Sequence, residues 1–123
     1  MSANIFSKLF SGFKKDPYKE IQNFLNETLL PLGFQKEYMA GGPGLIHNHK
    51  YIRLNTLVLF AYDVREQEYF LSAAADTNKK KTVNGEEYTI YDFSVSSPDL
   101  VNEETRPYIY QKFKSWLTEN QIN

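Results

Sequence analysis

Two closely spaced histidines are the residues most suited to metal chemistry in this sequence. His47 and His49 are two positions apart, so on a β-strand both imidazoles would lie on one face and could supply half of a metal site. A third ligand is not nearby in the sequence, and the chain contains no cysteine. We therefore expect surface histidines beside a turn, with no bound metal and no cofactor.

A glycine-rich stretch precedes the histidines and invites comparison with phosphate-binding loops. Residues 40–44 read Ala-Gly-Gly-Pro-Gly, which is incompatible with regular structure and predicts a loop or wide turn. A phosphate loop needs a helix directly after it, with its N-terminus facing the anion. Residues 45–50 are instead extended in character and lack the GK[ST] pattern. Phosphate binding is disfavoured, and any other function of residues 41–44 is left open.

Three aspartates, Asp63, Asp76 and Asp92, lie at the ends of predicted strands and could converge on a carboxylate-based site. Aspartate at a strand end is more often a turn or capping residue. The chain has no GxSxG elbow, no HExxH motif, no nucleotide fingerprint and no cysteine nucleophile. We therefore expect a non-enzymatic protein and keep a small enzyme as the third alternative.

Length and composition favour one domain. The chain has 123 residues, and we place a single α+β domain at 16–123 after a short amphipathic segment at 1–15. The formal net charge of −1 provides no general attraction to nucleic acid or to an anionic membrane. The lack of cysteine suits the cytoplasm. We expect neither a secretory signal nor a membrane-spanning segment.

The hydrophobic pattern predicts an α+β fold built on a central strand at 51–63. Helices are expected at 17–30, where Asp16 would be the N-cap, and at 107–120. An edge strand is expected at 34–39, a returning strand at 68–76, a hairpin around Asn84-Gly85 and a strand at 88–96. The resulting sheet is mostly antiparallel, has four to five strands, and carries the N- and C-terminal helices on one face.

A turn centred between Arg65 and Glu66 fixes which residues of the central hairpin lie opposite one another. It pairs Phe60 with Leu71 on the predicted core face, and Leu59 with Ser72 on the other face. That other face should stay at least partly open, and its mixture of apolar and polar groups is typical of interfaces. We predict that it binds a protein partner or a second copy of the chain through Arg53, Asn55, Leu57, Leu59, Phe70, Asp76, Tyr88 and Asp92.

Two segments resemble parts of known families. The order of a helix, LLPLGF at Leu29–Phe34, strands, and a terminal helix with KFKSWL at Lys112–Leu117 resembles small bacterial α+β domains of the toxin-immunity type. That resemblance implies a cytosolic protein that neutralises a cognate toxin by direct binding. The stretch Leu54–Asp76 with its preceding helix also resembles type III secretion chaperones, which implies a small dimer that binds an extended effector segment.

Overall fold

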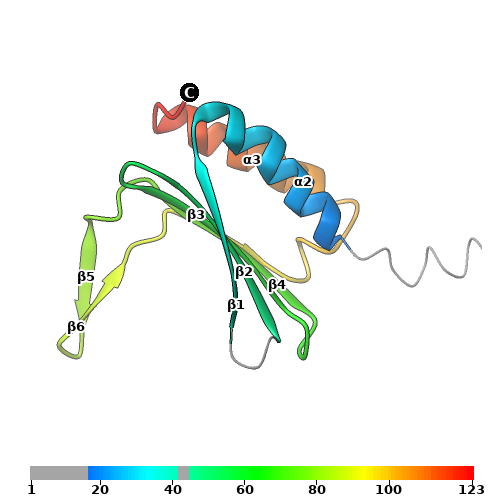
Figure 1. Ribbon diagram of the computed structural model, residues 1–123, viewed down its shortest axis with the longest axis horizontal. Helices are drawn as coiled ribbons and strands as arrows, with labels where there is room; N and C mark the ends of the chain where they lie inside the picture. The colour runs from blue at the N-terminus through cyan, green and yellow to red at the C-terminus, as the bar shows by residue number, and fades with distance from the viewer. Residues whose placement is uncertain (1–16, 42–44) are drawn as a thin grey trace, which may run out of the picture.

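The computed structural model describes residues 17–41 and 45–123. The amphipathic segment predicted at 1–15 and the predicted N-cap Asp16 lie outside these residues. The described chain is α+β, as predicted, with two α-helices and seven strands in the part described (Figure 1). Their bounds in chain order are α2 Tyr18–Leu29, the 3-10 turn η1 Leu30–Leu32, β1 Gln35–Gly41, β2 Ile46–Arg53, β3 Thr56–Asp63, β4 Glu68–Ala74, β5 Lys80–Val83, β6 Glu86–Thr89, β7 Phe93–Ser96 and α3 Arg106–Glu119.

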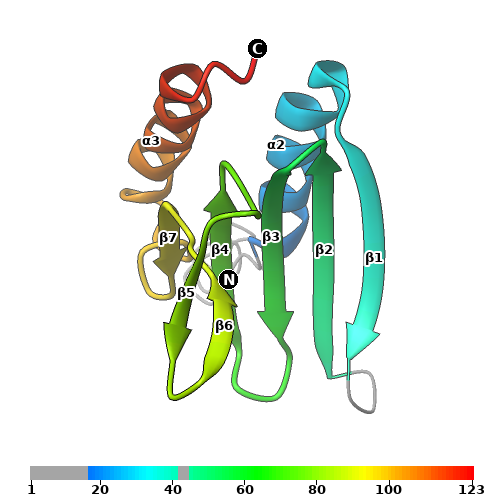
Figure 2. The same ribbon diagram turned by 90° about the vertical axis from the view of Figure 1, so that its left-hand side faces the viewer.

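Five of the strands form one antiparallel sheet in the order β1-β2-β3-β4-β7. The first four form a meander, because each strand pairs with the next one in the sequence. Strands β5 and β6 pair only with each other and form a separate hairpin between β4 and β7. The predicted sheet of four to five strands with both helices on one face is therefore confirmed (Figure 2).

Both helices cover the same face of the sheet with their apolar sides. Helix α2 buries Ile21, Leu25 and Leu29, which are spaced by one helical turn. Helix α3 buries Ile109, Phe113, Trp116 and Leu117, which also follow helical spacing. The strands beneath contribute Tyr51, Val58, Phe60, Leu71 and Ala73 to the same core. Full burial of large apolar side chains is the main stabilising term in a domain of this size.

The register predicted for the central hairpin is confirmed. Strands β3 and β4 pair Leu57 with Ala74 and Leu59 with Ser72, and these side chains face away from the helices. The same ladder pairs Phe60 with Leu71 on the core side. The hairpin predicted around Asn84-Gly85 is also present, with Thr82 opposite Glu87. Asn84 and Gly85 both have positive φ angles, which the two-residue turn requires.

The single central strand predicted at 51–63 is wrong, because the chain turns back at Leu54-Asn55. Arg53 pairs with Thr56 across this tight turn, and Leu54 takes a left-handed φ of 54°. Odd-numbered residues of β2 therefore face the core, whereas in β3 the even-numbered residues do. Tyr51 is consequently buried in the core, whereas one continuous strand at 51–63 would place it on the same face as Leu59; Ile52 lies on the opposite face beside Leu57.

The strand predicted at 88–96 is also divided. Residues 86–89 belong to β6 of the separate hairpin, and 93–96 form β7 at the edge of the main sheet. Asp92 marks the division, because its carboxylate accepts a hydrogen bond from Ala75 N and its own N–H donates to Ala73 O. Phe93 and Val95 pack against the core, whereas Tyr91 is exposed.

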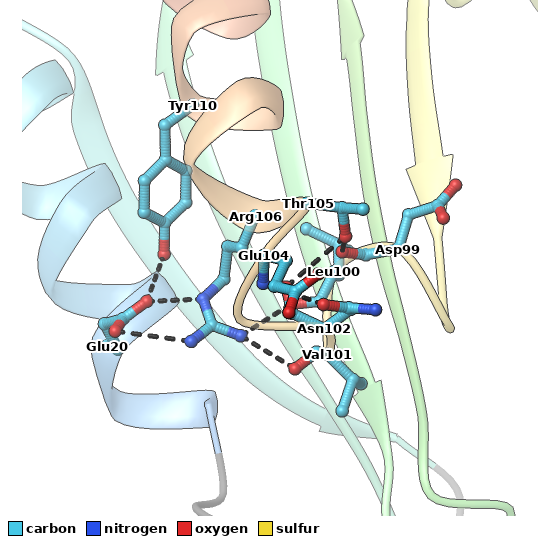
Figure 3. Close-up of polar contacts among 9 residues, drawn as sticks. All are labelled: Glu20, Asp99, Leu100, Val101, Asn102, Glu104, Thr105, Arg106 and Tyr110. Carbon is cyan, nitrogen blue, oxygen red and sulfur yellow. Dashed lines mark hydrogen bonds and ion pairs between the residues drawn. The ribbon is translucent and has the colours of Figure 1, made fainter.

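A buried arginine joins the two ends of the fold. Arg106, the first residue of α3, donates from Nε to Glu20 of α2 at 2.5 Å and from Nη1 to the carbonyls of Leu100 and Val101 (Figure 3). Tyr110 donates to the same carboxylate at 2.9 Å. Burial is the main cause that raises the pKa of Tyr110, and its hydrogen bond to Glu20 adds to it. The group fixes α2, α3 and the segment before α3 in one arrangement.

We predict that Phe60→Ala and Trp116→Ala each lower the free energy of unfolding by about 3–5 kcal/mol, because each removes a large buried ring. Urea denaturation followed by circular dichroism measures the loss. Tyr108→Ala, at an exposed position of α3, is the matched control and should change stability little. A loss below about 1 kcal/mol at both core positions would contradict the assigned core.

We also predict that Arg106→Ala lowers the free energy of unfolding by roughly 3 kcal/mol, because it removes the donor to the Leu100 and Val101 carbonyls and the cation that pairs with Glu20. Glu20→Gln should cost clearly less, since its side chain is 56% exposed and the amide oxygen can still accept a hydrogen bond. Chemical denaturation of both variants is the measurement. Equal losses would show that the ion pair, and not the anchoring of the carbonyls, dominates.

Candidate functional site

The face of the sheet opposite the helices carries a group of exposed and half-buried apolar side chains. Antiparallel pairing aligns residues of β1 to β4 in rows across this face. Met39 is 60% exposed and Phe70 is 40% exposed, and the register places them in one row with Asn48 and Ala61 between them. Leu59 and Leu57 lie in the next two rows and are half-buried. We call the group the open-face patch; it consists of Met39, Ile46, Ile52, Leu57, Leu59 and Phe70.

Polar rows cross and flank the open-face patch. Glu37 and Lys50 lie opposite each other on β1 and β2, which is a favourable cross-strand pair of opposite charges. Ser72 and Ser94 lie 3.3 Å apart between their hydroxyl oxygens on β4 and β7. A set of apolar groups bordered by short polar and charged ones is the usual composition of a protein-binding surface.

The structure brings only three of the predicted site residues together on this face. Leu57, Leu59 and Phe70 lie on it as expected. Strand alternation instead places Arg53 on the same side as the buried Tyr51, toward the helices, which corrects its predicted position. The cause is the change of side at the turn after Arg53.

The other four predicted site residues lie off the main sheet and are also corrected. Asn55 is in the turn between β2 and β3, and Asp76 caps a bend by accepting a hydrogen bond from Asn78 N. Asp92 holds the connection to β7. Tyr88 belongs to the separate hairpin, where its hydroxyl donates to Glu86 at 2.7 Å, and this hydrogen bond raises the pKa of Tyr88.

The separate hairpin, here called the arm (residues 79–91), stands on the side of the sheet opposite the helices (Figures 1 and 2). Its register gives it two different faces. Val83, Tyr88 and Ile90 share one face and are 44%, 45% and 38% exposed. Lys80 and Glu87 lie on the other face with two threonines. The sequence signalled the hairpin through Asn84-Gly85 but gave no sign that it would leave the sheet.

The two histidines lie on the helix side and not at the surface beside a turn, which corrects the prediction for His49. Its side chain is 2% exposed, and its Nε2 lies 2.6 Å from the hydroxyl of Tyr18. His47 contacts the hydroxyl of Tyr38 through Nδ1. Each histidine therefore has one ring nitrogen occupied by a tyrosine. Within residues 17–41 and 45–123, no group of three metal-ligating side chains is present.

His49 is held in its neutral form. Burial, then the positive charge of Lys36 and then His47 lower the pKa of His49 to about 4. The Nδ1 atom of His49 is buried without a hydrogen-bond partner in the described chain. A neutral imidazole can accept the proton of Tyr18 at Nε2 while its own proton stays on Nδ1. The rings of Phe60 and Tyr18 around it identify this as part of the packed core.

The three aspartates considered for catalysis do not converge. Asp63 ends β3 and accepts a hydrogen bond from Glu66 N in the turn that follows. Asp76 and Asp92 lie near the beginning of the same strand, close to Ala75 and Asn55. All three act as acceptors for backbone N–H groups. No arrangement for general acid–base catalysis results from them.

A shallow hollow of about 510 Å³ lies between the start of β7 and the outer side of α3. Phe93, Tyr108, Lys112 and Trp116 are among its lining residues. No local sequence pattern predicts this hollow, because its walls come from segments that are distant in sequence. Its lining mixes aromatic rings with charges of both signs and defines no ligand.

Comparisons with protein-family models, with curated proteins and with solved structures gave no match. In the described ranges, 17–41 and 45–123, neither helix has the length and apolar character needed to cross a bilayer. The fold and the surface therefore define the candidate site by themselves, as an exposed apolar sheet face with an adjoining arm.

We predict that the stability of the protein falls as the pH is lowered from about 6.5 to about 4. In this window the unfolded chain protonates His49 and the folded chain does not, so acid favours unfolding. The loss from this residue is on the order of 3 kcal/mol.

The measurement is urea denaturation at several pH values for the wild type and for His49→Gln, which cannot be protonated. The difference in stability between the two proteins should change with pH across this window. Parallel pH profiles would contradict a depressed pKa at His49.

Proposed function

We propose that this chain is a non-enzymatic protein-binding domain of the immunity type, which neutralises a cognate toxin by binding it directly through the open-face patch. The observation that carries the proposal is the contrast between the two sides of one sheet. One side is covered by α2 and α3, whereas the other leaves Met39, Ile46 and Phe70 exposed beside Leu57 and Leu59. Such a patch on a folded domain is typical of an interaction site.

The physical basis for binding is the removal of these side chains from water. Leu57, Leu59 and Phe70 lie on two adjacent strands of a rigid sheet, so little side-chain or backbone ordering is needed on association. Phe70 is an exposed aromatic ring, and aromatic side chains are frequent among the anchors that carry most of the energy in protein interfaces. The charged pair Glu37 and Lys50 at the border would add specificity of orientation.

The class of partner comes from the resemblance of LLPLGF and KFKSWL to immunity-type domains, and the cytoplasmic location belongs to the same proposal. A binder that occupies a toxin stoichiometrically needs no catalytic group. This agrees with the use of all three candidate aspartates as backbone acceptors.

We predict that Leu59→Asp and Phe70→Asp each weaken partner binding at least 100-fold, because a charge buried without a partner at the centre of an interface costs several kcal/mol. The test uses the product of the neighbouring gene as the candidate toxin. Growth rescue on co-expression and isothermal titration calorimetry are the two measurements.

Two matched controls are deletion of residues 2–12 and replacement of Lys79, Lys80 and Lys81 by Ser, both of which should leave binding near the wild-type value. Circular dichroism separates loss of binding from loss of folding. Phe70 is the more exposed position, so Phe70→Asp decides the question if Leu59→Asp unfolds the chain. A folded Phe70→Asp variant that binds fully would exclude the open-face patch.

A further inference from the structure

The arm is an unusual element because its side chains are almost all exposed in the structure of residues 17–41 and 45–123. Every residue of β5 is exposed, and of β6 only Thr89 is partly covered. A two-stranded hairpin without a packed face is marginally stable in water. Packing of one face of the hairpin against another surface would stabilise it.

The arm also carries an apolar face of its own. Cross-strand pairing sets Lys81 opposite Tyr88 and Val83 opposite Glu86, so Val83 and Tyr88 share a face. Ile90 continues it, because Ile90 N donates to Lys79 O and extends the ladder. A single copy of the chain therefore exposes two separate apolar surfaces. One is the open-face patch on the sheet, and the other is the face of the arm formed by Val83, Tyr88 and Ile90.

We propose that a second copy of this chain is the occupant of the open-face patch in the absence of a partner, in a twofold dimer where each arm lies across the sheet of the other copy. The arm stands on the side of the sheet that carries the open-face patch (Figures 1 and 2), and Phe70, Val83 and Tyr88 are all exposed in one copy. In a dimer with twofold symmetry, the arm of each copy would contact the open-face patch of the other copy, so both apolar surfaces would be covered.

The charges of the arm are compatible with this exchange. Lys81 and Glu86 flank the apolar residues of the arm, and Glu68 and Lys50 flank the open-face patch. Each of the two apolar surfaces therefore has a positive and a negative side chain at its edge. An antiparallel arrangement of the two copies can place opposite charges next to each other. One arm on one sheet would give a small interface, but twofold symmetry doubles the area toward the roughly 800 Å² per partner of stable complexes.

This inference deepens the proposed function, because the second copy and the toxin compete for the same sheet face. The dimer would keep the patch covered until a partner displaces the arm. Failure of the dimer hypothesis can be distinguished from failure of the toxin-binding hypothesis, because the self-association assay contains no partner and the binding assay measures the partner directly.

The test is mixing of two variants, measured by analytical ultracentrifugation and native mass spectrometry. The variants are Tyr88→Asp, which alters the arm, and Phe70→Asp, which alters the sheet. Wild-type protein should be dimeric at tens of micromolar, and the dimer dissociation constant of each variant alone should be at least tenfold higher than that of the wild type. The equimolar mixture should form a mixed dimer more tightly than either variant alone, because the intact arm of Phe70→Asp meets the intact sheet of Tyr88→Asp.

Thr89→Asp is the matched control, because it places the same charge on the polar face of the arm opposite Lys80 and should leave the dimer unchanged. Circular dichroism confirms that each variant is folded. A wild-type protein that is monomeric at hundreds of micromolar would overturn the dimer proposal. Toxin binding would still be decided by the calorimetry described above. Variants that stay monomeric on mixing would overturn the exchange of arms.

Discussion

Burial of one sheet face under two helices is the interaction on which the rest of this structure depends. Val58, Phe60 and Leu71 lose contact with water because α2 and α3 lie over them, and no other face of the sheet is covered by a described helix. The hydrophobic effect scales with the apolar area removed from water, so this single layer supplies most of the stability. Neither described helix covers the opposite face, which leaves Met39, Ile46 and Phe70 exposed on it.

Much of the fold could be predicted from the sequence where the pattern is local. Helical spacing identified the buried stripes of α2 and α3, and Asn84-Gly85 identified a hairpin because this pair adopts the required backbone angles at low cost. The pairing of β3 with β4 followed from the position of one turn. These features depend on residues that are close together in the chain.

The turn at Leu54-Asn55 could not be recognised in the same way. Leucine is a poor residue for a left-handed conformation, and it continues the apolar pattern, so nothing interrupts the apparent strand. The signal that was overlooked is length, since strands rarely exceed roughly 10 residues. Missing the turn reversed the two faces before Leu54, which explains why Tyr51 and Arg53 were both assigned to the wrong side.

The candidate site was predicted in part for the same reason. Leu57, Leu59 and Phe70 lie after the missed turn, and their alternation could be read correctly. Tyr88 and Asp92 were misplaced because the departure of the arm from the sheet depends on contacts between Asp92 and β4, which are distant in sequence. Local pattern carries no information about such contacts.

The link between Arg106 and Glu20 has a consequence for biosynthesis. The two residues are 86 positions apart, whereas the strands of the meander pair with their neighbours in sequence. A ribosome releases α2 and the strands first, so their apolar faces must wait for α3 before they are fully covered. Local pairing can form during this interval, but exposed apolar surface in a growing chain favours aggregation. Helix α3, which is synthesised after every strand of the sheet, therefore determines when the core of the nascent domain is covered, and an early stop before Arg106 would release a chain with a formed meander and an unprotected core.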